Sequence, residues 1–197
     1  VTGHAGLSAA TSMTLSNLGA GSITAEADAL SVSGLTVGAD ATLTSRAAAL
    51  SLEDVDVGGD LQAIGVGLGQ TGTLDVDGHA TLQAGTGGLA IHNVSAGGLT
   101  ATGASITQTG TALVGSRADL LTGGDITLAD FSAGLLDADA AAITQTGTLT
   151  VTGVAKLDSP GAIALANVTA GALDVTTANQ LQIAGGTVTG DAVLSAA

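Results

Sequence analysis

The sequence contains no cysteine, one proline and, in Phe131, a single aromatic residue among its 197 positions. Without cysteine the fold can hold neither disulfides nor thiolate metal sites. The hydrophobic content of 45% is nevertheless that of a folded chain rather than a disordered one. Any core must therefore be filled by Leu, Val, Ile and Ala, and an ordinary globular core of such small side chains would be unusual.

Basic residues are equally scarce. Arg46, Arg117 and Lys156 stand against 17 acidic residues, which gives a net charge of −14. Three cations cannot displace the counterions of a nucleic acid, so no nucleic-acid partner is expected, and anionic lipid surfaces are disfavoured for the same reason. No signal-peptide pattern opens residues 1–197 and no apolar run approaches the ~18 residues of a membrane span, so neither is expected within this segment. We expect residues 1–197 to be a single repeat segment excised from a longer chain.

A motif of the form apolar-x-apolar-x-Asn/Asp-apolar recurs five times, at steps of 37, 39, 37 and 37 residues. In every copy a glycine follows the Asn or Asp by four positions. Asn and Asp tolerate the left-handed backbone region and Gly enters it without steric cost, so both are expected at sharp corners of the chain. The predicted corner positions are Asn17, Asp54, Asn93, Asp130 and Asn167 together with Gly21, Gly58, Gly97, Gly134 and Gly171.

A second motif, Gly-x-Ala-x-Leu, lies between these copies, with an extra residue at "GADATL" and without its glycine at "SRADL". Its final leucines are 36 to 39 residues apart. They are Leu7, Leu43, Leu82, Leu120, Leu157 and Leu194. The unit of about 37 residues thus contains two sub-units of about 18 to 19 residues each.

Each sub-unit divides into three short pieces in which apolar residues alternate, as in Leu50 and Leu52, Val55 and Val57, then Leu61 and Ala63. Such alternation, interrupted by Gly, Asn or Asp, indicates strands and turns. Three strands that bury one face are not stable alone, but stacked coils pair every strand with its equivalents above and below. We predict an all-β parallel β-helix of roughly 10 to 11 coils, three short strands per coil, forming a rod of about 50 Å.

The phrase "ITQTGT" starts at Ile106 and again at Ile143, and "QTGT" starts at Gln70. In the β-helix register Gln108, Gln145 and Gln70 point inward, where a buried amide needs backbone partners at the corner. The phrase is therefore predicted to be architectural.

The repeats and phrases such as "GGDLQA", "AGGLTATG", "GDITLAD" and "LTVTGVAKLDSPG" resemble the shaft of filamentous haemagglutinin and related large exoproteins of Gram-negative two-partner secretion systems. The resemblance implies a right-handed β-helix that is exported through an outer-membrane transporter and secreted or held at the bacterial surface. It also implies a stalk in an adhesin or contact-dependent exoprotein. Host or neighbouring-cell receptors would then be bound through other regions.

No catalytic, cofactor-binding or metal-binding residue is expected. His4 and His79 share a column but lie about four coils, or ~19 Å, apart, which excludes a zinc ion held by both. The full G-G-x-G-x-D calcium pattern never occurs, although weak calcium binding by an acidic rod stays open. No G-x-S-x-G motif for a serine nucleophile is present either.

Two alternatives to a non-enzymatic stalk remain. The paired carboxylates Asp75 with Asp77 and Asp137 with Asp139 suit a carbohydrate-active β-helix, although a solvated face explains them too and the regular steps leave no room for a cleft-forming loop. A receptor-binding module would expose an aromatic or Arg patch, and the sequence has neither. Unpaired strand edges at the two ends of the segment, Val1 and Ala197, further predict end-to-end association.

Overall fold

The computed structural model describes residues 3–197, and every regular element in that range is a β-strand. The strands are β1 (His4–Ser8), β2 (Ser12–Ala20), β3 (Ser22–Ala27), β4 (Ala29–Val37), β5 (Ala41–Ser45), β6 (Leu50–Val57), β7 (Leu61–Gly65), β8 (Leu68–Ala84), β9 (Leu89–Ile91), β10 (Asn93–Gly103), β11 (Ile106–Gln108), β12 (Thr111–Thr122), β13 (Asp125–Leu128), β14 (Asp130–Asp139), β15 (Ala142–Ser159), β16 (Ile163–Thr177), β17 (Leu181–Val188) and β18 (Ala192–Ala196). The strand edge predicted at Val1 lies outside the described residues.

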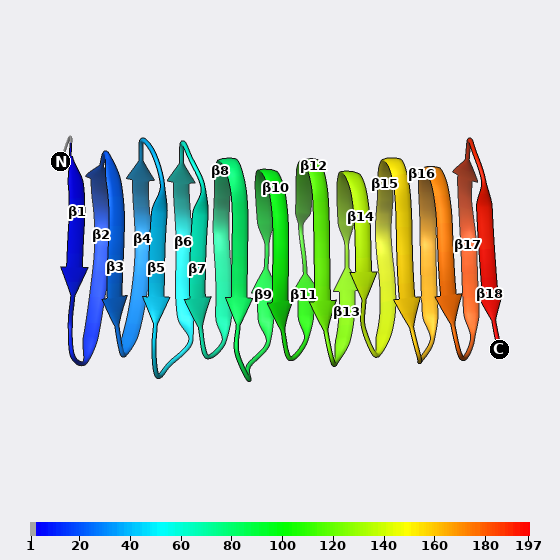
Figure 1. Ribbon diagram of the computed structural model, residues 1–197, viewed down its shortest axis with the longest axis horizontal. Coiled ribbons are helices and arrows are strands. Elements are labelled where there is room, and N and C mark those ends of the chain that lie inside the picture. The colour runs from blue at the N-terminus through cyan, green and yellow to red at the C-terminus, as the bar shows by residue number, and fades with distance from the viewer. Residues whose placement is uncertain (1–2) are drawn as a thin grey trace.

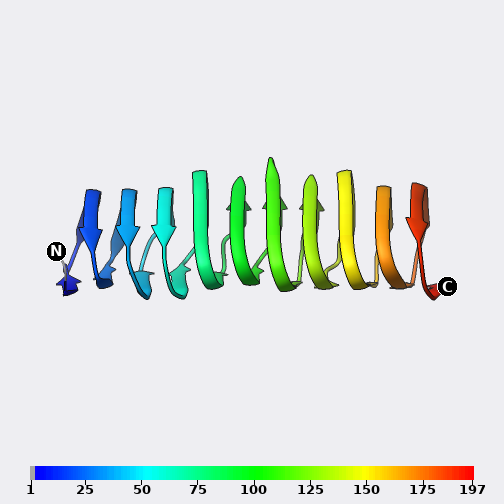
Figure 2. The same ribbon diagram turned by 90° about the horizontal axis from the view of Figure 1, so that it is seen from above.

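The strands form stacked coils. All pairings are parallel, and each residue pairs with one that lies about 19 residues away in the coil before or after it, as Leu50 does with Leu68 and Leu68 with Leu89. Figures 1 and 2 show the coils in a single row from the blue N-terminal end to the red C-terminal end. About ten turns at ~4.8 Å each give a rod of about 48 Å. The predicted all-β parallel β-solenoid is confirmed.

Each coil has three sides, which we number in chain order. In one coil Leu68 and Gln70 face inward from side one, Leu74 and Val76 from side two, and Ala80, Leu82 and Ala84 from side three. All seven belong to β8, which runs for 17 residues around two corners. The three strand pieces predicted for each coil are the three sides, and in this coil they join around both corners into one continuous strand.

Side three packs large side chains against small ones. In one coil the first two inward residues of this side are Ala118 and Leu120, and the coils on either side place Leu99 and Leu136 beside Ala118. The same alternation of large and small side chains between neighbouring coils recurs along the rod. The inward pairs are Ile23 and Ala25, Ala41 and Leu43, Leu61 and Ala63, Ala80 and Leu82, Leu99 and Ala101, Ala118 and Leu120, Leu136 and Ala138, Ala155 and Leu157. Alternation of this kind lets large and small side chains interdigitate, as a close-packed interior requires, without aromatic side chains on this side.

Side two holds the single aromatic side chain. Phe131 is buried, and its neighbours in the same inward column are Ala112 in the preceding coil and Leu149 in the following one. The small Ala112 leaves space for the larger ring. Together with the alternation on side three, this shows that neighbouring coils are complementary rather than identical. The sequence accordingly repeats every 37 residues or so, which is two coils, instead of every 19.

Candidate functional site

The first corner of each coil, between sides one and two, carries the Asn/Asp positions predicted from the sequence. In the coils between them the same corner carries a glycine, and Thr73, Thr111 and Thr148, each directly after that glycine, pair with the Asn or Asp of the following coil. The corner residues in chain order are Asn17, Gly34, Asp54, Gly72, Asn93, Gly110, Asp130, Gly147, Asn167 and Gly185. The Asn93 Oδ1 accepts the N–H of Thr111 in the next coil at 3.0 Å, and a Cβ on Gly110 would lie 2.5 Å from that oxygen. The glycine thus leaves the space that the Asn or Asp side chain occupies.

The same ladder bond occurs at two further coils. Thr73 donates its N–H to Asp54 Oδ1 at 3.0 Å, and Thr148 donates to Asp130 Oδ1 at 2.8 Å. Within residues 3–197, only Asn17 and Asp54 among non-glycine residues have a left-handed backbone, with φ of 49° and 50°. The prediction that these corner residues use the left-handed backbone region is therefore wrong for Asn93, Asp130 and Asn167. Those corners bend without it.

The second corner, between sides two and three, holds the predicted glycines Gly21, Gly58, Gly97, Gly134 and Gly171. A Cβ on Gly97 would lie 2.5 Å from the carbonyl oxygen of Asp77 in the coil before it. The glycines of the Gly-x-Ala-x-Leu motif, such as Gly78 and Gly190, occupy the same corner in the other coils. The two sequence motifs thus meet in one column, where coils approach too closely for a side chain. Ser116, which departs from the motif, donates its hydroxyl to Gly97 O at 2.6 Å.

The third corner, between sides three and one, holds residues that were not predicted from the sequence. Four buried hydroxyls occupy it: Ser45, Thr122, Ser159 and Thr177. Ser159 donates to Ala141 O in the preceding coil at 2.8 Å, and its Oγ accepts the N–H of Gly161 at 3.1 Å. These hydroxyls replace the backbone partners that a tight turn removes. One Ser or Thr per corner gives no recognisable signal in a chain rich in both.

The three glutamines of the repeated phrase lie inside side one, as predicted. Gln70, Gln108 and Gln145 are buried, and each Oε1 accepts a backbone N–H from the next coil, donated by His92, Ala129 and Ala166 at 2.8, 2.9 and 3.0 Å. The Nε2 of Gln108 donates to Gly110 O at 3.0 Å. Within residues 3–197 no buried side-chain nitrogen or oxygen lacks a partner. The predicted structural role of this phrase is supported by its contacts.

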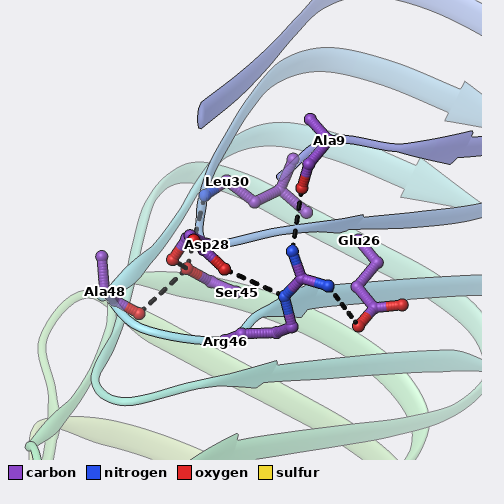
Figure 3. Close-up of polar contacts among 7 residues, drawn as sticks. All are labelled: Ala9, Glu26, Asp28, Leu30, Ser45, Arg46 and Ala48. Atoms are coloured by element: carbon purple, nitrogen blue, oxygen red, sulfur yellow. Dashed lines mark hydrogen bonds and ion pairs between the residues drawn. The ribbon is translucent and has the colours of Figure 1, made fainter. Parts of the chain in front are cut away.

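Arg46 ties three coils together at the third corner (Figure 3). Its Nε donates to Asp28 at 3.0 Å, Nη1 to Glu26 at 3.2 Å, and Nη2 to the carbonyl oxygen of Ala9 at 2.9 Å. About 40% of the Arg46 side chain is exposed, and exposed ion pairs contribute little each, about 0.2–1 kcal/mol. The contact to Ala9 reaches two coils back, so Arg46 links the first three coils of the described segment through side-chain contacts.

The other two cations lie together on side three. Arg117 donates to Asp119 and Asp137 at 2.5 and 3.0 Å, and Lys156 lies 3.7 Å from Asp137. The hydrogen bond that Arg117 donates to Asp119, reinforced by the negative charge of that carboxylate, raises the pKa of Arg117 above its ordinary value. Asp137, one of the candidate paired carboxylates, is thereby committed to two ion pairs. Every cation in residues 3–197 thus has a carboxylate partner.

The other candidate pair borders an open hollow of about 400 Å³ on side two. Asp75 and Asp77 form one wall, Ser95 and Gly97 the floor, and Leu113 stands opposite, with Ser132 of the coil beyond it also lining the hollow. Both carboxylates are on the same wall, whereas glycoside hydrolysis needs carboxyl groups on two sides of the bond. Across the hollow stands an aliphatic side chain.

The repeat matches a known family of repeats. Residues 38–95 and 129–170, just over half of the chain, match the family model described as repeats of unknown function, DUF5649. The chain belongs to the DUF5649 repeat family. The matched DUF5649 ranges contain four of the five Asn/Asp corners, and β11 and β12, in the unmatched stretch between them, continue the same coils. No curated protein and no solved structure matches the sequence.

The three histidines of this DUF5649 segment each contact a hydroxyl of a neighbouring coil. His4, His79 and His92 contact the hydroxyls of Ser22, Thr100 and Thr109 at 2.9, 2.9 and 3.2 Å. No cluster of three or more His, Asp or Glu side chains suited to a metal ion occurs in the described part of the chain. That part also contains no helix able to span a membrane.

Proposed function

We propose that this DUF5649 segment is a shaft: a structural stalk of a secreted or surface-held bacterial exoprotein, which places binding or effector regions at a distance from the cell. The observation that carries the proposal is the unbroken stacking of the coils. From β1 to β18 every coil pairs with its neighbours, and no insertion interrupts the row. A rod of this kind suits a spacer that holds other regions at a fixed distance better than it suits a catalytic domain.

The resemblance of the repeats to filamentous haemagglutinin shafts supports an adhesin or contact-dependent exoprotein exported through an outer-membrane transporter. A chain without cysteine and with few cations is suited to passage through such a pore. The fixed two-coil unit also supports it, because a shaft can be lengthened by whole units without changing its surface. Receptors of host or neighbouring cells would be bound by other regions of the protein.

A carbohydrate-active β-helix is the alternative, and the geometry gives it less support. Asp137 is held by Arg117 and Lys156, and Asp75 and Asp77 share one wall of their hollow. Sugar rings also bind through stacking on exposed aromatic rings, and Phe131 is buried.

The location is tested in the full-length protein made by its own cells, with an epitope inserted at Thr86 in the exposed bend between β8 and β9. The proposal predicts that intact cells or the culture medium carry the epitope and that loss of the outer-membrane transporter abolishes this. Labelling that requires cell lysis would contradict it.

The stalk role is tested by two further changes. Removing one 37-residue unit should leave export intact and shorten the reach of the distal region by about 10 Å, two coil spacings. Replacing the segment by a flexible linker of equal residue number should abolish a fixed reach. Unchanged reach and activity with the linker would contradict the stalk role.

A further inference from the structure

Side two carries a groove that the shaft role does not use. Asp75, Ser95 and Leu113 stand at the same register position of three successive coils. The outward side chain of the middle coil is small, and Gly97 follows it, so a trough runs along β10 between two higher rows. Its walls are two coil steps, about 9.6 Å, apart. A second hollow of about 250 Å³ extends the trough toward the first corner, past Thr73 and Thr111.

The two walls differ in chemistry. Asp75 and Asp77 lie on one strand two residues apart, which places their carboxylates on the same wall about 6.7 Å from each other. Both are exposed, and neither forms an ion pair among the described residues, whose cations are all paired elsewhere. The opposite wall is Leu113, with 54% of its surface exposed. The trough therefore presents two unpaired charges to one side of an occupant and an apolar surface to the other.

We infer that this trough docks an extended peptide segment of the pattern basic, apolar, basic. In an extended chain residues i and i+2 point to one side about 6.7 Å apart, while residue i+1 points to the other. Two Lys or Arg side chains at i and i+2 thus reach Asp75 and Asp77, and the apolar residue between them reaches Leu113. The space of two coil steps admits one extended backbone.

Charge decides which class of partner fits. A second copy of this chain also carries a net charge of −14 and has Arg46, Arg117 and Lys156 committed to its own carboxylates. The cations must therefore come from a different protein or from another region of the same one. The groove is independent of the shaft proposal, since it needs only the local coil surface.

The test uses two labelled peptides of identical composition, acetyl-Ser-Lys-Leu-Lys-Ser-amide and acetyl-Ser-Lys-Lys-Leu-Ser-amide. Only the first places both lysines on one side of an extended chain. Binding to the 197-residue chain is followed by fluorescence anisotropy at low salt. We call the first the alternating peptide and the second the adjacent-lysine peptide. We expect the alternating peptide to bind about fivefold more tightly than the adjacent-lysine peptide, as two exposed ion pairs and one apolar contact would give.

Variants locate the binding. The double change Asp75→Asn with Asp77→Asn should reduce the affinity for the alternating peptide to that for the adjacent-lysine peptide. Leu113→Ser should weaken binding of the alternating peptide about threefold. The matched control is Asp139→Asn with Asp158→Asn, two exposed carboxylates on side three without ion pairs among residues 3–197. This control removes the same charge and should change affinity less than about twofold. Circular dichroism verifies that all variants are folded.

Three results would overturn the inference. Equal affinity of the two peptides would show that spacing is not recognised. Equal loss in the Asp139 and Asp158 control would show general attraction to an acidic surface. Absence of binding by the alternating peptide to the unmodified chain would remove the groove as a docking site.

Discussion

The Oε1 atom of Gln108 accepts the backbone N–H of Ala129, one coil further along the rod, at 2.9 Å. Its neighbours in the same inward column are aliphatic: Ile91 in the coil before and Leu128 in the coil after. From Gln70 to Gln145 a polar side chain that bonds the next coil thus alternates with an apolar one that only packs, whereas the column is apolar in the coils before Gln70. This relationship makes two coils, rather than one, the structural unit of the solenoid.

Gln108→Leu tests the hydrogen-bonding half of that unit. The variant removes the shorter of two hydrogen bonds to Gly110 O, which keeps the Asp130 N–H at 3.4 Å, and one of two acceptors of the Ala129 N–H, which keeps Gln108 O at 3.2 Å. The two lost hydrogen bonds together contribute about 1–3 kcal/mol. We expect urea unfolding to show a loss of that size. Ile91→Leu, a volume-conserving change in the neighbouring coil, should cost less than about 1.5 kcal/mol. Equal losses in the two variants would argue that the amide contributes only packing.

Exchanging Ala118 and Leu120 tests the packing half. The double variant Ala118→Leu with Leu120→Ala keeps composition and hydrophobicity, but it stacks leucine on Leu99 and Leu136 and leaves alanine beside Ala101 and Ala138. Overpacking on one row and a cavity on the other should together cost about 3 kcal/mol or more. Thermal unfolding measures the loss, and a stability equal to that of the unmodified chain would mean that coil order does not matter.

The Asn/Asp corners should respond unequally to alanine. Asp54→Ala and Asp130→Ala each remove one ladder bond, to Thr73 N and Thr148 N respectively, and Asp54→Ala also removes the long contact from the Thr73 hydroxyl at 3.4 Å. Only Asp54 has a left-handed backbone, with φ of 50°, a conformation that costs alanine about 1 kcal/mol. We therefore expect Asp54→Ala to be the more destabilising by that amount in urea titrations. A reversed order would contradict the backbone explanation.

Arg46→Met should weaken the N-terminal coils locally. It keeps the apolar stem but removes the donors to Glu26, Asp28 and Ala9, for a loss of about 1 kcal/mol at low salt. Hydrogen exchange should speed up in β1 and β3 and stay unchanged beyond β8. Because exposed charges are screened, 1 M salt should narrow the difference between variant and parent. A loss independent of salt would point to stem packing instead.

The sequence was sufficient for the repeat geometry and insufficient for the surface. Alternating apolar residues and the constant step of 37 predicted the stacked coils and the inward Gln70, because both depend on positions that recur in register. The hydroxyl of Ser159 was missed, since a corner that accepts either Ser or Thr leaves no fixed motif. The groove was missed because Asp75, Ser95 and Leu113 come from three coils, and it exists only through the small residue between two larger ones.

The central claim, a straight and regular rod, is tested most directly by pulsed electron spin resonance on paired spin labels. The chain has no cysteine, so Thr14→Cys with Thr144→Cys, and Ser51→Cys with Thr144→Cys, give two uniquely labelled variants. The three positions lie in one outward column on side one, separated by seven and five coil steps. We predict narrow distance distributions, with backbone separations of about 34 and 24 Å. Broad distributions, or a difference between the pairs far from 10 Å, would contradict the rod.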